Sequence, residues 1–245
     1  LTPHGGLPHA IICFPYGGGS GTIYRDLAEA VSKKSAQHSV YSVNLPGHEP
    51  GDDRELISIG EAAGRLVEEI LERVPGKLIL YGHCVGSALT LETARRLGEA
   101  GRDVEQLFLG AILPPGNARA LGRNHDPWKL ISDRNILRFL GRIGLPRIDA
   151  GKEVLEDMIR SFRHDVRNYY RFFYELETGK ECKLDIPVHF VVGEHDLMTR
   201  NYSRKMSRWE RYGQQVRLQI IDGANHYFMK TNSEDLAHII IGQES

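Results

Sequence analysis

One cysteine lies in a turn whose residue types suit nucleophilic chemistry. The segment Gly82-His83-Cys84-Val85-Gly86 directly follows the apolar run Lys77–Tyr81 and directly precedes a segment of helical period. Glycines on both sides of the cysteine are needed where a strand turns so sharply into a helix that side chains would collide with both elements. The sulfur then lies exposed beside a helix N-terminus, which stabilises a thiolate. We therefore interpret Cys84 as a nucleophile on a strand-to-helix elbow rather than as a small buried thiol.

Later loops supply an acid and a base in the order that such a nucleophile requires. Gly193-Glu194-His195-Asp196 follows the apolar run Val188–Val192, and Asp222-Gly223-Ala224-Asn225-His226-Tyr227 follows the run Val216–Ile221. Loops at the carboxyl ends of strands in an open α/β sheet are where sites assemble. The chain order nucleophile, acid, histidine predicts Asp196 as the orienting acid and His226 as the base.

Other titratable residues near these motifs have competing interpretations. Asp196 alone would also suit a turn or the N-cap of a helix expected over Thr199–Tyr212, and His226 alone would be an ordinary loop histidine. Glu194 and His195 are rivals for the acid position, but the acid is expected at the far end of the turn. We interpret His83 as structural. His164 and Asp165, on a helix expected in the insertion described below, could face the substrate cavity, but we interpret them as part of a solvated helical face.

A glycine-rich loop near the start of the chain suits stabilisation of an oxyanion. Phe14-Pro15-Tyr16-Gly17-Gly18-Gly19-Ser20 follows the first apolar run, and glycines allow backbone N–H groups to approach developing negative charge. The predicted oxyanion hole consists of the amides of Gly17 and Val85. A phosphate-binding loop is disfavoured, since the segment lacks a Lys-Ser/Thr ending and the spacing of a dinucleotide fingerprint.

Short apolar runs bounded by Gly and Pro alternate with segments of helical period, which predicts an α/β fold with a mostly parallel, doubly wound sheet. A capping-box spacing, Ser58 to Glu61, begins one helix, and Gly101 ends the helix that starts at Val85. The expected strands are His9–Phe14, Val40–Val43, Leu78–Tyr81, Leu107–Leu113, Val188–Val192 and Val216–Ile221.

The segment from Pro114 to Glu175 interrupts this alternation. It has helical pattern and no convincing strand, so we expect a helical insertion, a lid, between two strands of the sheet. The 245 residues, 41% of them apolar, suffice for a single domain spanning residues 1–245.

Composition excludes several classes of partner and cofactor. Lys and Arg (31) nearly balance Asp and Glu (32), so no whole-molecule charge favours nucleic acid or an anionic membrane. No apolar run approaches the ~20 residues of a membrane span. The widely spaced Cys13, Cys84 and Cys182 form neither a disulfide framework nor a paired metal-ligand pattern, so we expect no metal and a reducing, cytoplasmic location.

Taken together, five motifs resemble those of thioesterases of nonribosomal peptide and polyketide synthesis, which have the α/β-hydrolase fold. They are FPYGGGS, NLPGH at Asn44–His48, GHCVG, GEHD and GANHYF, and they occur in the family's order over nearly the whole chain. The resemblance implies an acyl or peptidyl chain delivered as a thioester on the phosphopantetheine arm of a carrier protein. It implies Cys84, Asp196 and His226 as catalytic residues, Gly17 and Val85 as oxyanion donors, and no other cofactor.

Two departures from that family affect what the resemblance implies. Most members have serine where this chain has Cys84. The acid position after the penultimate strand resembles the stand-alone, type II editing enzymes, whereas many chain-terminating domains carry the acid one strand earlier. We expect a monomer or a domain of a larger synthetase, which releases its acyl group by intramolecular cyclisation, including lactam formation, or by hydrolysis.

Three alternative functions follow from the sequence. The chain could be an editing enzyme that hydrolyses misprimed carrier proteins. It could be a cysteine hydrolase like the dienelactone hydrolases, although those lack a large helical lid. It could also be a non-catalytic module that only binds carrier proteins.

Overall fold

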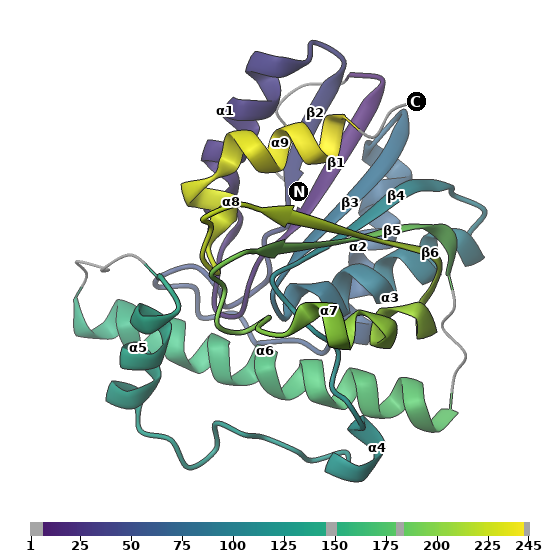
Figure 1. The fold of residues 1–245 in the computed structure, drawn as a ribbon. Helices are drawn as coiled ribbons and strands as arrows, with labels where there is room; N and C mark the ends of the chain where they lie inside the picture. The colour runs from purple at the N-terminus through teal and green to yellow at the C-terminus, as the bar shows by residue number, and fades with distance from the viewer. Residues whose placement is uncertain (1–6, 146–150, 180–183, 243–245) are drawn as a thin grey trace.

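A six-stranded, fully parallel sheet forms the centre of the molecule, with strand order β2-β1-β3-β4-β5-β6 (Figure 1). The computed structural model describes residues 7–145, 151–179 and 184–242. The strands are β1 (His9–Phe14), β2 (His38–Ser42), β3 (Lys77–His83), β4 (Val104–Gly110), β5 (Leu184–Gly193) and β6 (Gly213–Ile221). All six strands expected from the sequence are present, and the order reverses direction beside β1 and β3, where sites form in such sheets.

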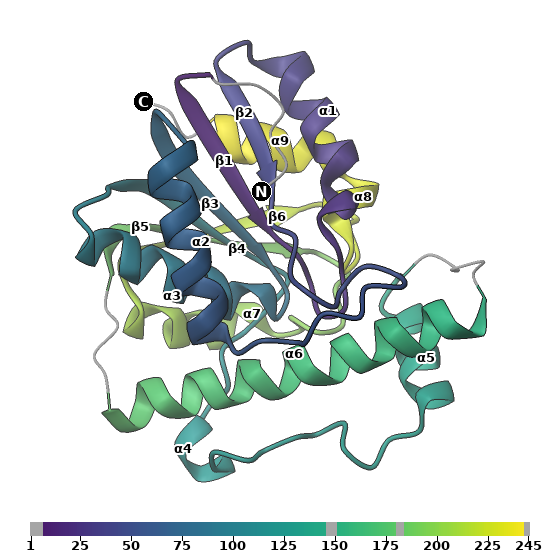
Figure 2. The ribbon, with the colours of Figure 1, turned by 180° about the vertical axis from the view of Figure 1, so that it is seen from behind.

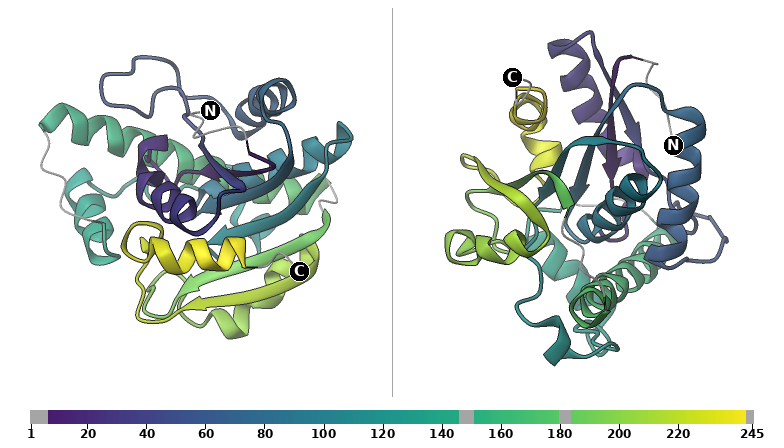
Figure 3. Two further views of the ribbon diagram at one scale, coloured as in Figure 1. Left: turned by 90° about the horizontal axis from the view of Figure 1, so that it is seen from above. Right: turned by 90° about the vertical axis from the view of Figure 1, so that its right-hand side faces the viewer.

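Helices cover both faces of the sheet and bury two separate cores (Figures 1 and 3). Because side chains alternate along a strand, Ile12 and Leu80 face one core while Ile11 and Ile79 face the other. The first core lies under α2 (Ile59–Arg73) and α3 (Gly86–Glu99), and the second lies under α1 (Arg25–Lys34) and α9 (Ser233–Ile241). The short elements near these faces are η1 (Gly21–Tyr24) and α8 (Phe228–Thr231).

Local signals in the sequence fix several ends of these elements. The Ser58 side chain accepts a hydrogen bond from the Glu61 amide (3.2 Å) and caps α2 as predicted. Gly101 has φ +73° just after α3, in agreement with the expected left-handed stop. The strand expected over Leu107–Leu113 instead ends at Gly110, because Ala111 has φ +57° and leaves the extended conformation.

The helical insertion follows β4 and lies across the carboxyl ends of the strands (Figures 1 and 2). It consists of α4 (Ala118–Leu121), α5 (Asp133–Arg142) and the long α6 (Lys152–Gly179), which continues four residues past the expected end at Glu175. Phe162 and Val166 of α6 are buried against the second core, and Tyr169 and Phe173 are buried against the first. The insertion therefore packs on both halves of the sheet.

One predicted helix is wrong in its extent. Thr199–Tyr212 contains only α7 (Tyr202–Lys205) and the 3-10 helix η2 (Met206–Arg211). Asn201, with φ +65°, prevents a helix from beginning at Thr199, and Thr199 itself hydrogen-bonds to Asp196. Among residues 7–145, 151–179 and 184–242, no helix is long and apolar enough to cross a membrane.

Candidate active site

Cys84 lies at the turn between β3 and α3 in a strained backbone conformation, with φ +53°. Its amide donates to the carbonyl oxygen of Gly110 at the end of β4 (2.8 Å), which holds the turn against the sheet. A Cβ at Gly82 would lie 2.1 Å from Thr90 Oγ1, and one at Gly86 would lie 2.1 Å from the Pro15 carbonyl oxygen. Both positions therefore require glycine, and the tight turn presents Cys84 at the N-terminus of α3.

His226 and Asp196 form a buried pair on neighbouring loops. His226 Nδ1 lies 3.1 Å from both carboxylate oxygens of Asp196, and the two side chains are almost fully buried. The Asp196 carboxylate also accepts hydrogen bonds from the Met198 amide (2.8 Å) and Thr199 Oγ1 (3.1 Å). These donors fix the carboxylate, so His226 Nδ1 donates to it. The other ring nitrogen is left for Cys84, which lines the same cavity as His226.

Glu194 and His195, the two other candidates for the acid position, do not reach the His226 imidazole. Both side chains are exposed, and the Glu194 carboxylate accepts from the Gly223 amide (2.8 Å) on the loop that carries His226. The amide of His195 donates to the carbonyl oxygen of Ala224 (2.9 Å). Glu194 and His195 thus join the two loops together, whereas Asp196 is the residue that reaches the imidazole.

His83 is fully buried, as expected for a structural residue, and it also supports His226. Its Nε2 donates to the carbonyl oxygen of His226 (2.9 Å), and its Nδ1 accepts from the Tyr81 hydroxyl (2.7 Å). Burial, together with the neighbouring His226 ring, holds the pKa of His83 well below its ordinary value. An uncharged His83 can therefore donate and accept at once, and it anchors the backbone of the predicted base.

Gly17 and Val85 lie close together, and Val85 directly follows Cys84 in the chain. A Cβ at Gly17 would lie 3.0 Å from Val85 Cγ2, so the glycine loop and the elbow touch. Within the described residues, neither amide donates to another protein group. Two unpaired N–H groups beside a nucleophile are the arrangement that stabilises an oxyanion.

Cys84 and His226 line a small cavity of about 60 Å³, and Gly17 and Val85 line the same cavity. Aromatic side chains from the insertion form much of the remaining wall: Trp128, Phe139, Phe162, Tyr169 and Tyr170. A cavity of this size holds only a few water molecules. The site is thus apolar and closed over by the insertion.

Electrostatics inside this closed site favour a charged imidazole. Burial alone lowers the pKa of His226, but negative charge on Cys84 and the hydrogen bond to Asp196 outweigh it and raise the pKa to about 10. A protonated imidazole beside the sulfur stabilises a thiolate, the reactive form of cysteine. The arrangement can therefore perform nucleophilic attack without a metal ion, and no group of three or more metal-binding side chains gathers in the described part of the chain.

We expect the pKa of His226 to fall when Cys84 is replaced by Ala, because the charge on the sulfur is the largest influence that raises it. In the unaltered protein, the protonated imidazole stabilises the fold fully below pH 6.5, and this contribution is lost as the pH rises towards 10. NMR titration of the histidine rings measures the pKa, and thermal melts at several pH values measure the stability. His189, whose pKa burial lowers to about 4, serves as the control and should titrate unchanged in Cys84→Ala. An unshifted His226 would show that the sulfur carries no charge.

The interpretation of His164 and Asp165 as a solvated face was wrong. Asp165 is largely buried and accepts hydrogen bonds from the Gly18 amide (2.8 Å) and from His48 Nε2 (3.0 Å). These partners lie 147 and 117 residues away in the chain, so helical periodicity alone could not reveal them. No signal in the sequence showed that Thr199 donates a hydrogen bond to Asp196. Cys182, the third cysteine of the chain, lies outside the described residues.

The fold and the arrangement of the site define an α/β hydrolase with an inserted helical region. Residues 9–243 match the thioesterase domain family, and the chain belongs to that family. The solved structure of the type II thioesterase BorB from the borrelidin biosynthetic cluster is similar, with a TM-score of 0.76 and 25% identity, and the match covers 98% of this chain and 94% of that one.

Two curated relatives show the range of proteins in which the similar region occurs. A probable cadicidin biosynthesis thioesterase from Streptomyces griseus is 24% identical over 89% of this chain. Phenyloxazoline synthase MbtB from Mycobacterium tuberculosis is also 24% identical, over 95% of this chain. The chain spans 58% of the first relative and 16% of the second.

Proposed function

We propose that this protein is a thioesterase that takes an acyl or peptidyl group from a carrier-protein thioester onto Cys84. The observation that carries the proposal is the convergence of Cys84, the buried His226–Asp196 pair and the Gly17 and Val85 amides on one cavity. The family membership and the names of the relatives support a substrate held on a biosynthetic carrier protein. A sulfur nucleophile must stay reduced, which agrees with the cytoplasmic location expected from the sequence.

In the first half-reaction, the Cys84 thiolate attacks the thioester carbonyl carbon, and the carbonyl oxygen becomes an oxyanion that accepts from Gly17 and Val85. The intermediate then expels the phosphopantetheine thiolate, which takes the proton from His226. In the second half-reaction, His226 removes a proton from the incoming nucleophile, which attacks the acyl-Cys84 carbonyl. Cys84 leaves as a thiolate, and His226 is again protonated beside it.

The insertion must shift before a substrate can bind. A cavity of about 60 Å³ cannot hold an acyl chain of more than a few carbons. The wall formed by Trp128, Phe139 and Phe162 belongs to the insertion, so its displacement would enlarge the site. When the insertion closes again over bound substrate, the aromatic wall would keep bulk water away from the acyl-enzyme.

Incubation with a carrier protein loaded with a hexanoyl group tests this proposal. We expect loss of the acyl mass from the carrier and, in acid-quenched reactions, the same mass on the peptide that contains Cys84. The rate should exceed spontaneous thioester hydrolysis by on the order of 10³-fold or more. An unchanged acyl carrier would favour a non-catalytic binding module, and cleavage of a dienelactone in place of the thioester would favour that hydrolase class.

A hydrolytic editing enzyme is the second candidate, because the acid follows β5, the position expected of the stand-alone, type II enzymes. The similarity to BorB, a type II thioesterase, supports this candidate, whereas the similarity to part of MbtB, of which the chain spans 16%, supports a domain of a larger synthetase. The choice between hydrolysis and cyclisation depends on the fate of the acyl group on Cys84.

A further inference from the structure

Helix α6 of the insertion lies directly on the loop that carries Gly17. Gly18 has φ +73°, and a Cβ there would lie 2.7 Å from the carbonyl oxygen of Met158 on α6. A Cβ at Gly17 would lie 3.2 Å from a ring carbon of Phe162. The glycine loop is therefore held between α6 on one side and Val85 on the other, with no space for side chains.

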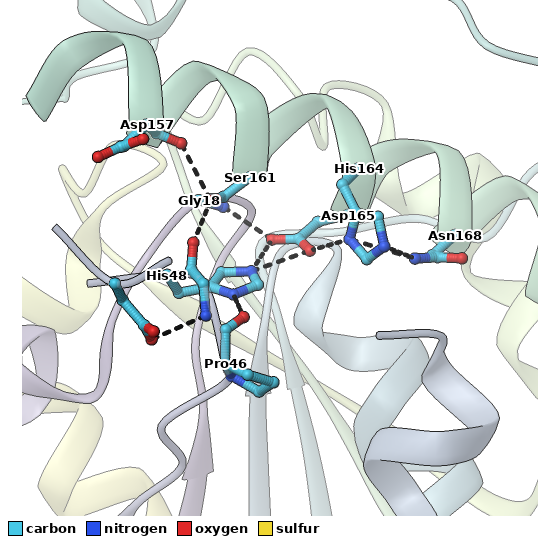
Figure 4. A network of polar contacts seen from close by, with 10 residues as sticks. Gly18, Pro46, His48, Asp157, Ser161, His164, Asp165 and Asn168 are labelled. Atoms are coloured by element: carbon cyan, nitrogen blue, oxygen red, sulfur yellow. Dashed lines mark hydrogen bonds and ion pairs between the residues drawn. The ribbon is translucent and has the colours of Figure 1, made fainter. Parts of the chain in front are cut away.

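Asp165 provides the polar link between α6 and this loop, as Figure 4 shows. Its Oδ2 accepts from the Gly18 amide at 2.8 Å, one residue after the Gly17 amide assigned to the oxyanion hole. His164 Nδ1, on the same helix, donates to Oδ1 at 3.3 Å. Burial raises the pKa of Asp165, but its contacts with His164, His48 and the Gly18 amide more than compensate and lower it. Asp165 therefore stays ionised and remains an acceptor.

His48 also binds the Asp165 carboxylate (Figure 4). Its Nε2 lies 3.1 and 3.0 Å from the two oxygens of Asp165, and its Nδ1 lies 2.9 Å from the carbonyl oxygen of Pro46. Both neighbours only accept hydrogen bonds, so both ring nitrogens must carry hydrogen and the ring is an imidazolium. The ion pair is almost fully buried on the His48 side, which fixes the carboxylate in one position.

Resting on the thioesterase function proposed above, we infer that Asp165 is a positioning residue for the oxyanion hole. By binding the Gly18 amide, it fixes the peptide that follows Gly17. This restricts the φ and ψ angles of Gly17 and, through them, the direction of the Gly17 N–H group in the preceding peptide. The hole is complete only while α6 lies on the loop. Since the insertion must shift to admit an acyl chain, stabilisation of the oxyanion is coupled to closure of the insertion over the substrate.

Two reactions at Cys84 separate this role from a general effect on the fold. Acylation by the small thioester hexanoyl-N-acetylcysteamine develops an oxyanion, whereas alkylation by iodoacetamide displaces iodide and develops none. Mass spectrometry of the Cys84 peptide follows both reactions without interference from Cys13 and Cys182. The matched control is Asp157, another α6 carboxylate two turns earlier, which lies 3.5 Å from the amide of Gly51 rather than on the glycine loop.

We expect Asp165→Ala to slow acylation about 10- to 100-fold, with KM changed less than about threefold and alkylation changed less than about twofold. Asp157→Ala should leave both reactions near the wild-type rates. Asp165→Asn keeps the size of the side chain and one acceptor oxygen, so it should give an intermediate loss of acylation and serves as the test if Asp165→Ala does not fold.

Unchanged acylation in the Asp165 variants would overturn the inference. Equal slowing of acylation and alkylation would also overturn it, because the residue would then act on the reactivity of Cys84 or on the whole fold. A wild-type protein that is alkylated at Cys84 but never acylated would defeat the proposed function itself, and the inference with it.

Discussion

Cys84→Ala and His226→Ala are each expected to lower kcat for acyl transfer by on the order of 10⁴-fold or more while the protein remains folded. Loss of the sulfur removes the nucleophile, and loss of the imidazole removes the base, which binds Asp196 and lines the same cavity as Cys84. Both residues lie on loops at the edge of the two cores. The measurements are thiol release from an acyl-N-acetylcysteamine thioester and a thermal melt followed by circular dichroism.

Two carboxylates on one loop provide the control for the acid. Asp196→Ala should cost less than the other two changes, about 10²- to 10³-fold in kcat, because Asp196 orients the imidazole but does not react. Glu194→Ala should leave activity nearly unchanged, since the Glu194 carboxylate is exposed and binds the Gly223 amide. Full activity in Asp196→Ala together with loss in Glu194→Ala would reverse the assignment of the acid.

The parts of the site that the sequence predicted depend on short-range constraints. Gly82 is needed because of its contact with Thr90, which arises from the sharp turn between β3 and α3. The second glycine of the same turn, Gly86, is needed because of a long-range contact with Pro15 after β1, but the pattern of the turn already indicates a glycine there. The strands could be predicted because a strand that is buried on both faces needs a short run of apolar residues, and such a run is visible in a few residues. Asp196 and His226 follow two neighbouring strands, so the parallel order of the sheet brings them together.

The features that the sequence did not predict depend on long-range contacts or on single backbone conformations. The positive φ of Ala111 ends β4, and alanine gives no sequence signal for this conformation. The positive φ of Asn201 delays the helix after the acid loop, and asparagine, although enriched at positive φ, does not by its type alone mark one position. Asp165 resembles any polar residue on an amphipathic helix until the loop of His48 and the loop of Gly18 fold against it. His83 supports His226 through a main-chain oxygen, which leaves no pattern of side-chain types.

Sulfur in place of the usual oxygen changes the chemical state of the acyl-enzyme. Attack by serine would convert the incoming thioester into a more stable oxoester, whereas attack by Cys84 exchanges one thioester for another. The acyl group therefore remains activated on the enzyme, and thioesters favour attack by amines over attack by water more than oxoesters do. The aromatic wall around Cys84 would further restrict water. These properties lead us to propose release by an internal nucleophile, including an amine or amide nitrogen that closes a lactam.

Cys84→Ser distinguishes cyclisation from editing. If ring closure is the native reaction, the serine variant should still be acylated, but it should stall as the oxoester or release mainly the hydrolysed acid, with the ratio of ring to acid falling about 10-fold or more. The substrate is a carrier-bound acyl chain with a well-placed internal amine, and mass spectrometry separates the ring from the acid by one water. The matched substrate, with the amine acetylated, controls for hydrolysis alone and should give acid with both proteins. Wild-type protein that yields only acid from the free amine would defeat cyclisation, and the Cys84 enzyme would then be an editing hydrolase.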